Sequence, residues 1–296
     1  MDTRLLHYFT VLTRVGNITK AADELHTTQP TLSRQLKELE NDVGAQLFIR
    51  GKRSITLTDA GVLFEQRAQT ILNYLDQTRQ DLHAQTEGLA GTLRIGCVES
   101  RLSQSVSDWL ADFQQQHPNV TFSIFSADGN SIRTQLDQGK LDVGFLLEPV
   151  ESAKYFSHII PVTETWGLIM AKSAPLADHK TIIGADLAGI PLIGSRRSIV
   201  INQIAAWLHI DSDSLNLRGD RNLENKVIPL LLNHGFYDIG IDGVLDFYPD
   251  GPLTFVPFNP ISQTRHTLIW RKNQQPSPIA QAFIDDVTAK IRAMPI

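Results

Sequence analysis

Residues 17–40 have the sequence NITKAADELHTTQPTLSRQLKELE, and this stretch decides the fold of the N-terminal region. Asn17 predicts the cap of a short helix that carries Ala21 and Ala22, whose small side chains allow another helix to approach closely. After a turn at residues 26–28, leucines at positions 32, 36 and 39 recur at helical spacing and predict a second helix with one buried face. The stretch therefore predicts a helix, a turn and a helix.

Polar side chains occupy the face of the second helix that lies opposite its leucines. Short polar groups near the start of a helix can reach base edges in the major groove of DNA, and longer cations can contact phosphates. An exposed polar face on a lone helix is more often only solvated. Here residues 47–57 add two predicted strands around a basic tip, a wing that suits the minor groove and favours DNA binding. The candidate DNA contacts are Thr19, Lys20, Gln29, Pro30, Thr31, Ser33, Arg34, Lys37, Lys52 and Arg53.

A long helix is predicted from Thr58, which can cap it, to about Glu87. Its apolar or small positions alternate steps of four and three residues, which is the spacing of a coiled-coil seam and predicts packing against a partner helix. Gly88 and Gly91 then break the helix and predict a hinge. The candidate dimerisation residues are Phe64, Ala68, Ile71, Leu75 and Leu82.

Strand and helix patterns alternate from Thr92 to the end of the chain and predict an α/β domain. Strands are expected at residues 93–98, 120–125, 143–147, 159–162, 167–171, 192–193, 237–241, 253–256 and 268–270. Helices are expected at residues 103–116, 131–138, 199–209, 223–233 and 278–293. The apolar runs at 159–162 and 167–171 predict two separate strands.

Residues 17–61 closely resemble the N-terminal domain of LysR-type transcriptional regulators. The likeness rests on the stretch 17–40 and on the residues that follow it, Gly44, Leu47, Phe48, Arg50 and LTDAG at 57–61. GTLRIG at 91–96 and GKLDVG at 139–144 resemble the effector domain of the same family.

This resemblance implies a fold in three parts. A winged helix-turn-helix would span residues 1–61 and a linker helix residues 58–90. The rest would form an α/β effector domain of the periplasmic-binding-protein type, made of two Rossmann-like subdomains joined by crossover strands. The first subdomain would comprise residues 91–163 with 267–296, and the second residues 164–266.

The resemblance also implies the function of an effector-responsive transcriptional regulator. Its winged helices would bind double-stranded DNA at an interrupted inverted repeat, and a small molecule in the cleft between the subdomains would modulate the oligomer. The implied partners are further copies of the chain, as a homodimer and a homotetramer, and RNA polymerase if the regulator is an activator.

The cleft of such a domain is lined by the carboxyl ends of strands and the N-termini of helices, whose free N–H groups suit an anionic effector. The candidate ligand contacts are Ser100, Gly129, Asn130, Ser195 and Arg196. Ser100 falls where the family often uses a Ser or Thr for its ligand. For Arg196 and its neighbour Arg197, a surface ion pair stays an equal alternative, and Asp242 is favoured as the cap of a turn.

Composition limits the class of protein further. The chain has 296 residues, a formal net charge of −5 and one cysteine, Cys97. A single cysteine excludes an internal disulfide scaffold and a cysteine zinc site, and favours the cytoplasm. Cys97 is predicted as a small buried residue rather than a redox sensor. The sequence has neither a signal peptide nor an apolar run of about 20 residues, so no membrane partner is expected.

Motifs of catalysis and of nucleotide or metal binding are missing from the sequence. We therefore expect no enzymatic activity, no cofactor and no metal site. One alternative is a bifunctional enzyme with an appended DNA-binding domain, because catalytic groups can be assembled in space rather than in sequence. A binding protein without DNA function is a further alternative, but it leaves the pattern of residues 17–61 unexplained.

Overall fold

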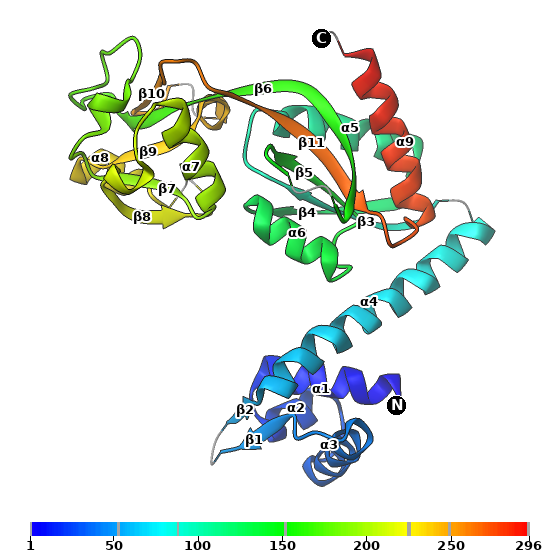
Figure 1. The fold of residues 1–296 in the computed structure, drawn as a ribbon. Coiled ribbons are helices and arrows are strands. Elements are labelled where there is room, and N and C mark those ends of the chain that lie inside the picture. The colour runs from blue at the N-terminus through cyan, green and yellow to red at the C-terminus, as the bar shows by residue number, and fades with distance from the viewer. Residues whose placement is uncertain are drawn as a thin grey trace. The chain divides into compact units, whose positions relative to one another are not determined.

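The computed structural model describes residues 2–51, 54–87, 89–150, 153–223, 226–247 and 250–294. The chain divides into two compact units, Met1–Gly88 with Asp137–Lys140, and Leu89–Leu136 with Leu141–Ile296 (Figure 1). The first unit contains the predicted helix-turn-helix and the long helix, and the second contains the predicted α/β domain. Within the described ranges, no helix is long and apolar enough to cross a membrane.

The first unit consists of helices and one small antiparallel sheet. Its elements are α1 (Thr3–Val15), α2 (Ile18–Glu24), α3 (Gln29–Val43), β1 (Phe48–Arg50), β2 (Ile55–Leu57) and α4 (Asp59–Glu87). Asn17 caps α2 as predicted, because its side chain accepts a hydrogen bond from the backbone N–H of Lys20 at 3.0 Å. Left-handed glycines end α1 at Gly16 (φ 71°) and α3 at Gly44 (φ 73°).

The leucine stripe of α3 forms the centre of the first unit's core. Leu32, Leu36 and Leu39 are fully buried, at 0% exposure, together with Phe9 of α1. Burial of this stripe turns the opposite, polar side of α3 outward. The hydrophobic pattern of the helix therefore determines which of its side chains can meet a partner.

The start of α4 is held against the chain that precedes β1. The side chain of Thr58 accepts a hydrogen bond from the backbone N–H of Gly61 at 3.0 Å, which confirms Thr58 as the cap of α4. A Cβ atom on Gly61 would overlap the carbonyl oxygen of Leu47. Glycine is required at position 61 because two backbone segments touch there.

The second unit has two halves, each around its own core, and the core of half I has one cluster on each face of its sheet. The elements of half I are β3 (Gly91–Cys97), α5 (Leu102–Gln116), β4 (Val120–Ser126), α6 (Gly129–Asp137), β5 (Val143–Leu147), α9 (Pro278–Ala293) and the adjoining parts of β6 (Tyr155–Ala171) and β11 (Gln263–Arg271). Phe145 and Leu268 point to the face that α5 and α9 cover. Their neighbours Leu146 and Ile269 point to the face that α6 covers, as expected for alternating strand residues.

Half II surrounds the other core, which is formed by residues between Trp166 and Phe258. Its elements are the rest of β6, η1 (Gly184–Leu187), β7 (Leu192–Ser195), α7 (Ser198–Trp207), η2 (Ser212–Ser214), β8 (Leu217–Arg221), α8 (Ile228–His234), β9 (Tyr237–Ile241), η3 (Asp242–Phe247) and β10 (Leu253–Pro257). Of the described strands, those on the main path follow the order β4-β3-β5-β11-β6-β9-β7-β8, and β10 pairs with β6.

The two halves are joined by β6 and β11, which cross from one to the other side by side (Figure 1). They pair antiparallel from Arg271 opposite Tyr155 to Gln263 opposite Thr165, with one shift in register between Arg265 and His266. We call this two-stranded crossover the hinge between the halves. The exact residue boundaries of the domains stay a prediction.

The structure differs from the expected elements at three places. The two strands expected around residues 159–171 are one strand, β6, because polar residues such as Glu164 break the apolar pattern without breaking the pairing with β11. β8 was not expected, since its residues LRGDR are polar and form an exposed edge. α8 begins at Ile228 and not at residue 223.

Candidate DNA-binding surface and effector cleft

The outer face of α3 carries the side chains that were predicted to contact DNA. Gln29, Pro30, Arg34 and Lys37 are exposed, and Thr31 and Ser33 are half-buried beside them. Thr19 and Lys20, at the start of α2, are exposed as well. The predicted wing-tip cations Lys52 and Arg53 lie outside the described residues. The strands of the wing, β1 and β2, are present as expected.

A further cation joins this face from the wing. Arg50 donates a hydrogen bond from Nη1 to the Ser33 hydroxyl at 3.4 Å, and its guanidinium lies 5.7 Å from the ring centre of Phe48. Gln29 donates to the same hydroxyl at 2.9 Å. The sequence contained the signal for Arg50 in the Leu47-Phe48-Ile49-Arg50 stretch, but the list of candidate contacts omitted it.

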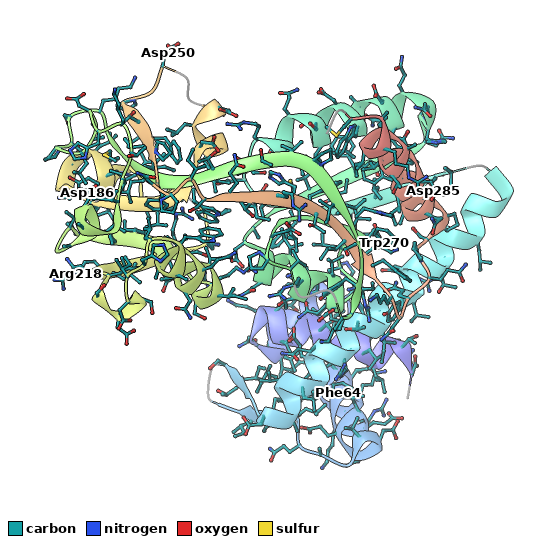
Figure 2. All side chains as sticks on the ribbon, turned by 45° about the horizontal axis from the view of Figure 1, so that its top comes forward. Phe64, Asp186, Arg218, Asp250, Trp270 and Asp285 are labelled. Carbon is teal, nitrogen blue, oxygen red and sulfur yellow. The ribbon has the colours of Figure 1, made fainter. Side chains whose placement is uncertain are left out.

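The predicted dimerisation residues of α4 have different surroundings. Phe64 packs edge-on against Phe9, with ring centres 5.3 Å apart, and Ala68 is fully buried, so both contribute to their own unit's core (Figure 2). Ile71 and Leu82 are exposed. Leu75 lines a groove of about 960 Å³ between α1 and α4. The role of these residues in dimerisation stays a prediction.

A small cleft of about 70 Å³ lies between the two halves of the second unit. It is bordered in half I by Glu99, by Gly129 at the start of α6 and by Glu148, and in half II by residues after β7 and β8 and by Trp166. Two of the predicted ligand contacts, Gly129 and Ser195, line this cleft. Asn130 and Arg196 do not; Arg196 faces the outside of half II, where it pairs with Asp220 at 3.6 Å.

Arg197 spans the cleft from half II to half I. Its Nη2 donates a hydrogen bond to the carbonyl oxygen of Pro149 at 2.6 Å. A Cβ on Gly129 would lie 3.4 Å from Arg197 Nη1, so the missing side chain at position 129 leaves room for the guanidinium. The Ser195 hydroxyl accepts from the backbone N–H of Arg197 at 3.2 Å. The sequence left a ligand contact and a surface ion pair equally open for Arg197, because its reach depends on the fold of the second half.

Arg221 also borders the cleft, but its charge is matched within half II. It forms a buried ion pair with Asp238 at 2.8 Å and donates a further hydrogen bond to the carbonyl oxygen of Ile239. Burial raises the pKa of Asp238, and the neighbouring guanidinium opposes that rise.

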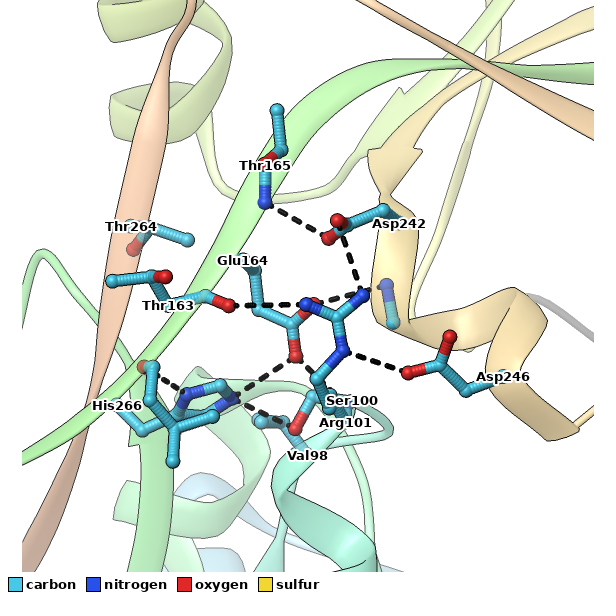
Figure 3. A network of polar contacts seen from close by, with 12 residues as sticks. Val98, Ser100, Arg101, Thr163, Glu164, Thr165, Asp242, Asp246, Thr264 and His266 are labelled. Carbon is cyan, nitrogen blue, oxygen red and sulfur yellow. Dashed lines mark hydrogen bonds and ion pairs between the residues drawn. The ribbon is translucent and has the colours of Figure 1, made fainter. Parts of the chain in front are cut away.

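Ser100 is fully buried in a polar network at the hinge and does not line the cleft (Figure 3). Its hydroxyl lies 2.9 Å from Nε2 of His266, and Nδ1 of His266 lies 2.9 Å from the carbonyl oxygen of Val162. A carbonyl only accepts, so Nδ1 carries the proton. Burial lowers the pKa of His266, which keeps Nε2 bare, and Ser100 donates to it.

Cys97 is buried at the end of β3, as predicted. Burial raises the pKa of its thiol to about 12, although a hydrogen bond with Ser103 works in the opposite direction. The thiolate is the reactive form of cysteine, so this thiol is chemically quiet at neutral pH.

Family models match both units. The model of the bacterial regulatory helix-turn-helix proteins of the lysR family matches residues 3–62, and the model of the LysR substrate binding domain matches residues 86–222. Together the two matches cover about two thirds of the chain. The chain belongs to the LysR family of transcriptional regulators, as its sequence predicted.

Individual relatives extend the match over the whole chain. The Hca operon transcriptional activator HcaR of Escherichia coli is 27% identical, with 99% of each chain covered. The transcriptional regulator YtlI of Bacillus subtilis is 33% identical over 64% of this chain, and that match spans only 60% of YtlI.

Solved structures confirm the fold. The LysR-family regulator CbnR superimposes with a TM-score of 0.76 at 23% identity, covering 98% of this chain and 99% of that one. Full-length OxyR of Pseudomonas aeruginosa gives 0.63 at 20% identity, covering 99% and 95%. The structures support the predicted winged helix-turn-helix and two-subdomain effector fold of the periplasmic-binding-protein type.

Proposed function

We propose that this LysR-family chain regulates transcription by inserting α3 into the major groove of an operator. The observation that carries the proposal is the outer face of α3, where exposed Gln29, Arg34 and Lys37 stand opposite a fully buried leucine stripe. A glutamine can pair bidentately with adenine and an arginine with guanine, whereas a lysine grips phosphate as a point charge. One solved structure of CbnR is a complex with its target DNA, which supports the same use of the fold here.

The operator we propose is an interrupted inverted repeat. Two winged helices related by two-fold symmetry read two half-sites, so the symmetry of the protein appears in the DNA. We propose Ile71, Leu75 and Leu82 of α4 as the residues that join two copies, since Phe64 and Ala68 are already used within one copy. Two such dimers form the proposed tetramer, and RNA polymerase is a partner if the chain activates its genes. Its place of action is the cytoplasm, where the DNA is.

The effector we propose is a small anion in the cleft between the halves. Arg197 brings its positive charge to this cleft, and Gly129 and the Ser195 hydroxyl border the same space. A ligand acts only through a difference in affinity between two conformations, which in allosteric proteins corresponds to about 1 to 3 kcal/mol of coupling. An effector that replaces the Pro149 carbonyl as the partner of Arg197 changes the contact between the halves and so supplies this difference.

We propose no enzymatic activity, because the named relatives are transcriptional regulators. The alternative of a bifunctional enzyme predicts that a ligand bound in the cleft is converted. Incubating the protein with a cleft ligand and analysing the mixture by mass spectrometry distinguishes a regulator from a bifunctional enzyme. A regulator leaves the ligand chemically unchanged.

Operator selection tests the proposed function directly. Purified full-length protein is mixed with fragmented host DNA at near-physiological salt, and the bound fragments are sequenced. We expect a few sites with two-fold symmetry, on which Arg34→Ala binds about 5 to 150 times more weakly, the equivalent of roughly 1 to 3 kcal/mol. Arg218→Ala, an exposed cation of the second unit, is the matched control and keeps full affinity. Equal affinity of Arg34→Ala and the control would overturn the proposed use of α3.

A further inference from the structure

One carboxylate at the hinge bonds to both halves of the second unit. Glu164, on the crossover strand β6, is fully buried. Its Oε1 accepts a hydrogen bond from the backbone N–H of Arg101 in half I at 2.7 Å, and its Oε2 accepts from the backbone N–H of Gly243 in half II at 2.9 Å (Figure 3). The carboxylate thus bridges the start of α5 and η3. Any opening at this place must break one of the two bonds.

A second carboxylate, Asp242, reinforces the bridge. It accepts a hydrogen bond from the backbone N–H of Thr165 at 2.9 Å and pairs with the Arg101 guanidinium at 3.1 Å. The Asp242 and Glu164 carboxyl groups are neighbours, because each bonds to the backbone N–H of the residue next to the other in the chain, Asp242 to Thr165 and Glu164 to Gly243. Two carboxyl groups can share a hydrogen bond only if one of them carries a proton.

Among the residues that the structure describes, one guanidinium and one imidazole face this pair. Arg101 contacts it from half I, but the same guanidinium also pairs with Asp246 at 2.7 Å. His266 faces it from β11, with Nε2 at 3.5 Å from Glu164 Oε1, and burial keeps that ring neutral by lowering its pKa. One guanidinium therefore serves three carboxyl groups: Glu164, Asp242 and Asp246. Retaining one proton relieves the repulsion between the two that touch.

The pKa values of the two groups are shifted in opposite directions, in agreement with this geometry. Burial and the hydrogen bond with Asp242 raise the pKa of Glu164 to about 8, against the opposing effect of the Arg101 backbone N–H. Burial alone would raise the pKa of Asp242, but bonds from the Thr165 amide, from Glu164 and from Arg101 outweigh it and lower that pKa. The proton therefore resides on Glu164.

We propose that Glu164 and Asp242 form a shared-proton latch that holds the two halves of the effector unit together at the hinge, and that opening of the hinge releases this proton. In the closed state one carboxyl is protonated and the other is ionised. In the open state both are hydrated and ionised, and the proton passes to solvent. Atoms and charge balance without any co-reactant.

The latch has a defined direction with pH. Glu164 has an ordinary pKa of 4.5 and a pKa of about 8 in the latch, so between these values the closed state holds one proton more than the open state. Raising the pH through this range favours opening, by up to about tenfold per pH unit for one proton. Below about pH 4.5 the latch is at full strength, and above about pH 8 its pH dependence ends.

A consequence for regulation rests on the proposed function: effector binding that closes the cleft becomes weaker as the pH rises from neutral towards 8. The latch itself is a property of the hinge and can be tested without an effector or DNA. A negative result in the operator-binding experiment therefore does not contradict the latch. A negative result for the latch does not contradict the proposed operator binding.

Hydrogen–deuterium exchange of the full-length protein, followed by mass spectrometry between pH 6 and 9, is the direct experiment. The three amides that donate to the pair, at Arg101, Thr165 and Gly243, report opening of the latch. Labelling times are scaled to cancel the intrinsic pH dependence of exchange. We expect the corrected protection of these amides to fall as the pH rises towards 8 and then to level off.

Two variants and a control show whether Glu164 and Asp242 cause this change of amide protection with pH. Glu164→Gln removes the group that carries the proton, so its protection should not change with pH. Asp242→Asn removes one of the causes that raise the pKa of Glu164, so its protection should change less with pH than that of the wild type. Asp112→Asn removes one exposed carboxylate from α5, where it pairs with Lys290, and should keep the slope of the wild type. If Glu164→Gln does not fold, the pH dependence of protection in Asp242→Asn, compared with the wild type, still tests the latch. A flat wild-type profile, or an unchanged slope in the folded variants, overturns the latch.

Discussion

The outer face of α3 and the hinge of the effector unit use the same kinds of polar side chains in opposite ways. On α3, Gln29, Arg34 and Lys37 are exposed and available to a partner. At the hinge, Ser100, Glu164 and His266 are fully buried, with Ser100 bonded to His266 and Glu164 bonded to backbone amides of both halves. A polar group that stays in water costs little free energy, whereas a buried polar group must have almost all of its hydrogen bonds satisfied. The first arrangement suits contact with another molecule and the second suits control of a conformation.

The strongest expected effect separates the two units. Gly61→Ala places a methyl group on the carbonyl oxygen of Leu47, so the start of α4 must move away from β1. We expect the first unit to lose at least about 3 kcal/mol of unfolding free energy, with loss of operator binding. Calorimetry of the full chain should show an unchanged transition for the second unit. Normal DNA binding by this variant would show that the start of α4 can move away from Leu47 without loss of function.

An equivalent substitution at the hinge should have the next largest effect. A Cβ on Gly243 would overlap the Glu164 carboxylate and lie 2.6 Å from the backbone nitrogen of Arg101. We expect Gly243→Ala to destabilise the second unit by about 2 to 3 kcal/mol, because the bridge between the halves must open. Gly219→Ala, at a glycine with no atom within 4 Å of the added Cβ, is the control in thermal unfolding. Equal melting temperatures for the two variants would contradict the tight packing of η3.

A moderate effect is expected from the charges on α3. Lys37→Ala removes a proposed phosphate contact, so it should weaken binding equally on all sequences and reduce the slope of log affinity against log salt by about 1. Arg34→Ala should instead reduce discrimination between operator and random DNA. Titrations at three or more salt concentrations, followed by fluorescence anisotropy, measure both quantities. The same profile for both variants would remove the distinction between base and phosphate contacts.

The smallest effect is expected at Cys97. Its burial in β3 makes it a packing residue, so Cys97→Ala should lower the unfolding free energy by only about 1 kcal/mol in denaturant titrations. Peroxide treatment of the wild type should leave operator affinity unchanged, because a thiol with a pKa of about 12 carries almost no thiolate at neutral pH. A peroxide response that disappears in Cys97→Ala would assign this residue a redox role.

The difference between the regions also explains what the sequence could predict. The caps at Asn17 and Thr58, the leucine stripe and the polar face of α3 all depend on neighbours a few residues apart, and the sequence predicts them correctly. The α/β class and most of its elements follow from local periodicity in the same way.

The hinge could not be predicted because its members come from distant parts of the chain. Glu164 interrupts an apolar run and therefore suggested the end of a strand, whereas in the structure it lies within β6 and bonds to residues 63 and 79 positions away. Ser100 was assigned to the cleft by resemblance, but its hydroxyl is occupied by His266, which is 166 residues further along. Asp242, expected to cap a turn, bonds instead to the Thr165 amide and Arg101.

The path of β11 also has a consequence for biosynthesis. The core of half I requires Leu268 of β11 and Phe283 and Val287 of α9, all near the end of the chain, whereas the core of half II is complete by Phe258. A ribosome therefore delivers every part of half II before it delivers the closing strand and helix of half I. In a nascent chain, half II can therefore fold first, while the apolar surfaces of β3 and α5 are still exposed. Messages truncated shortly before α9 would yield products that chaperones and proteases recognise, even though half II has all its residues.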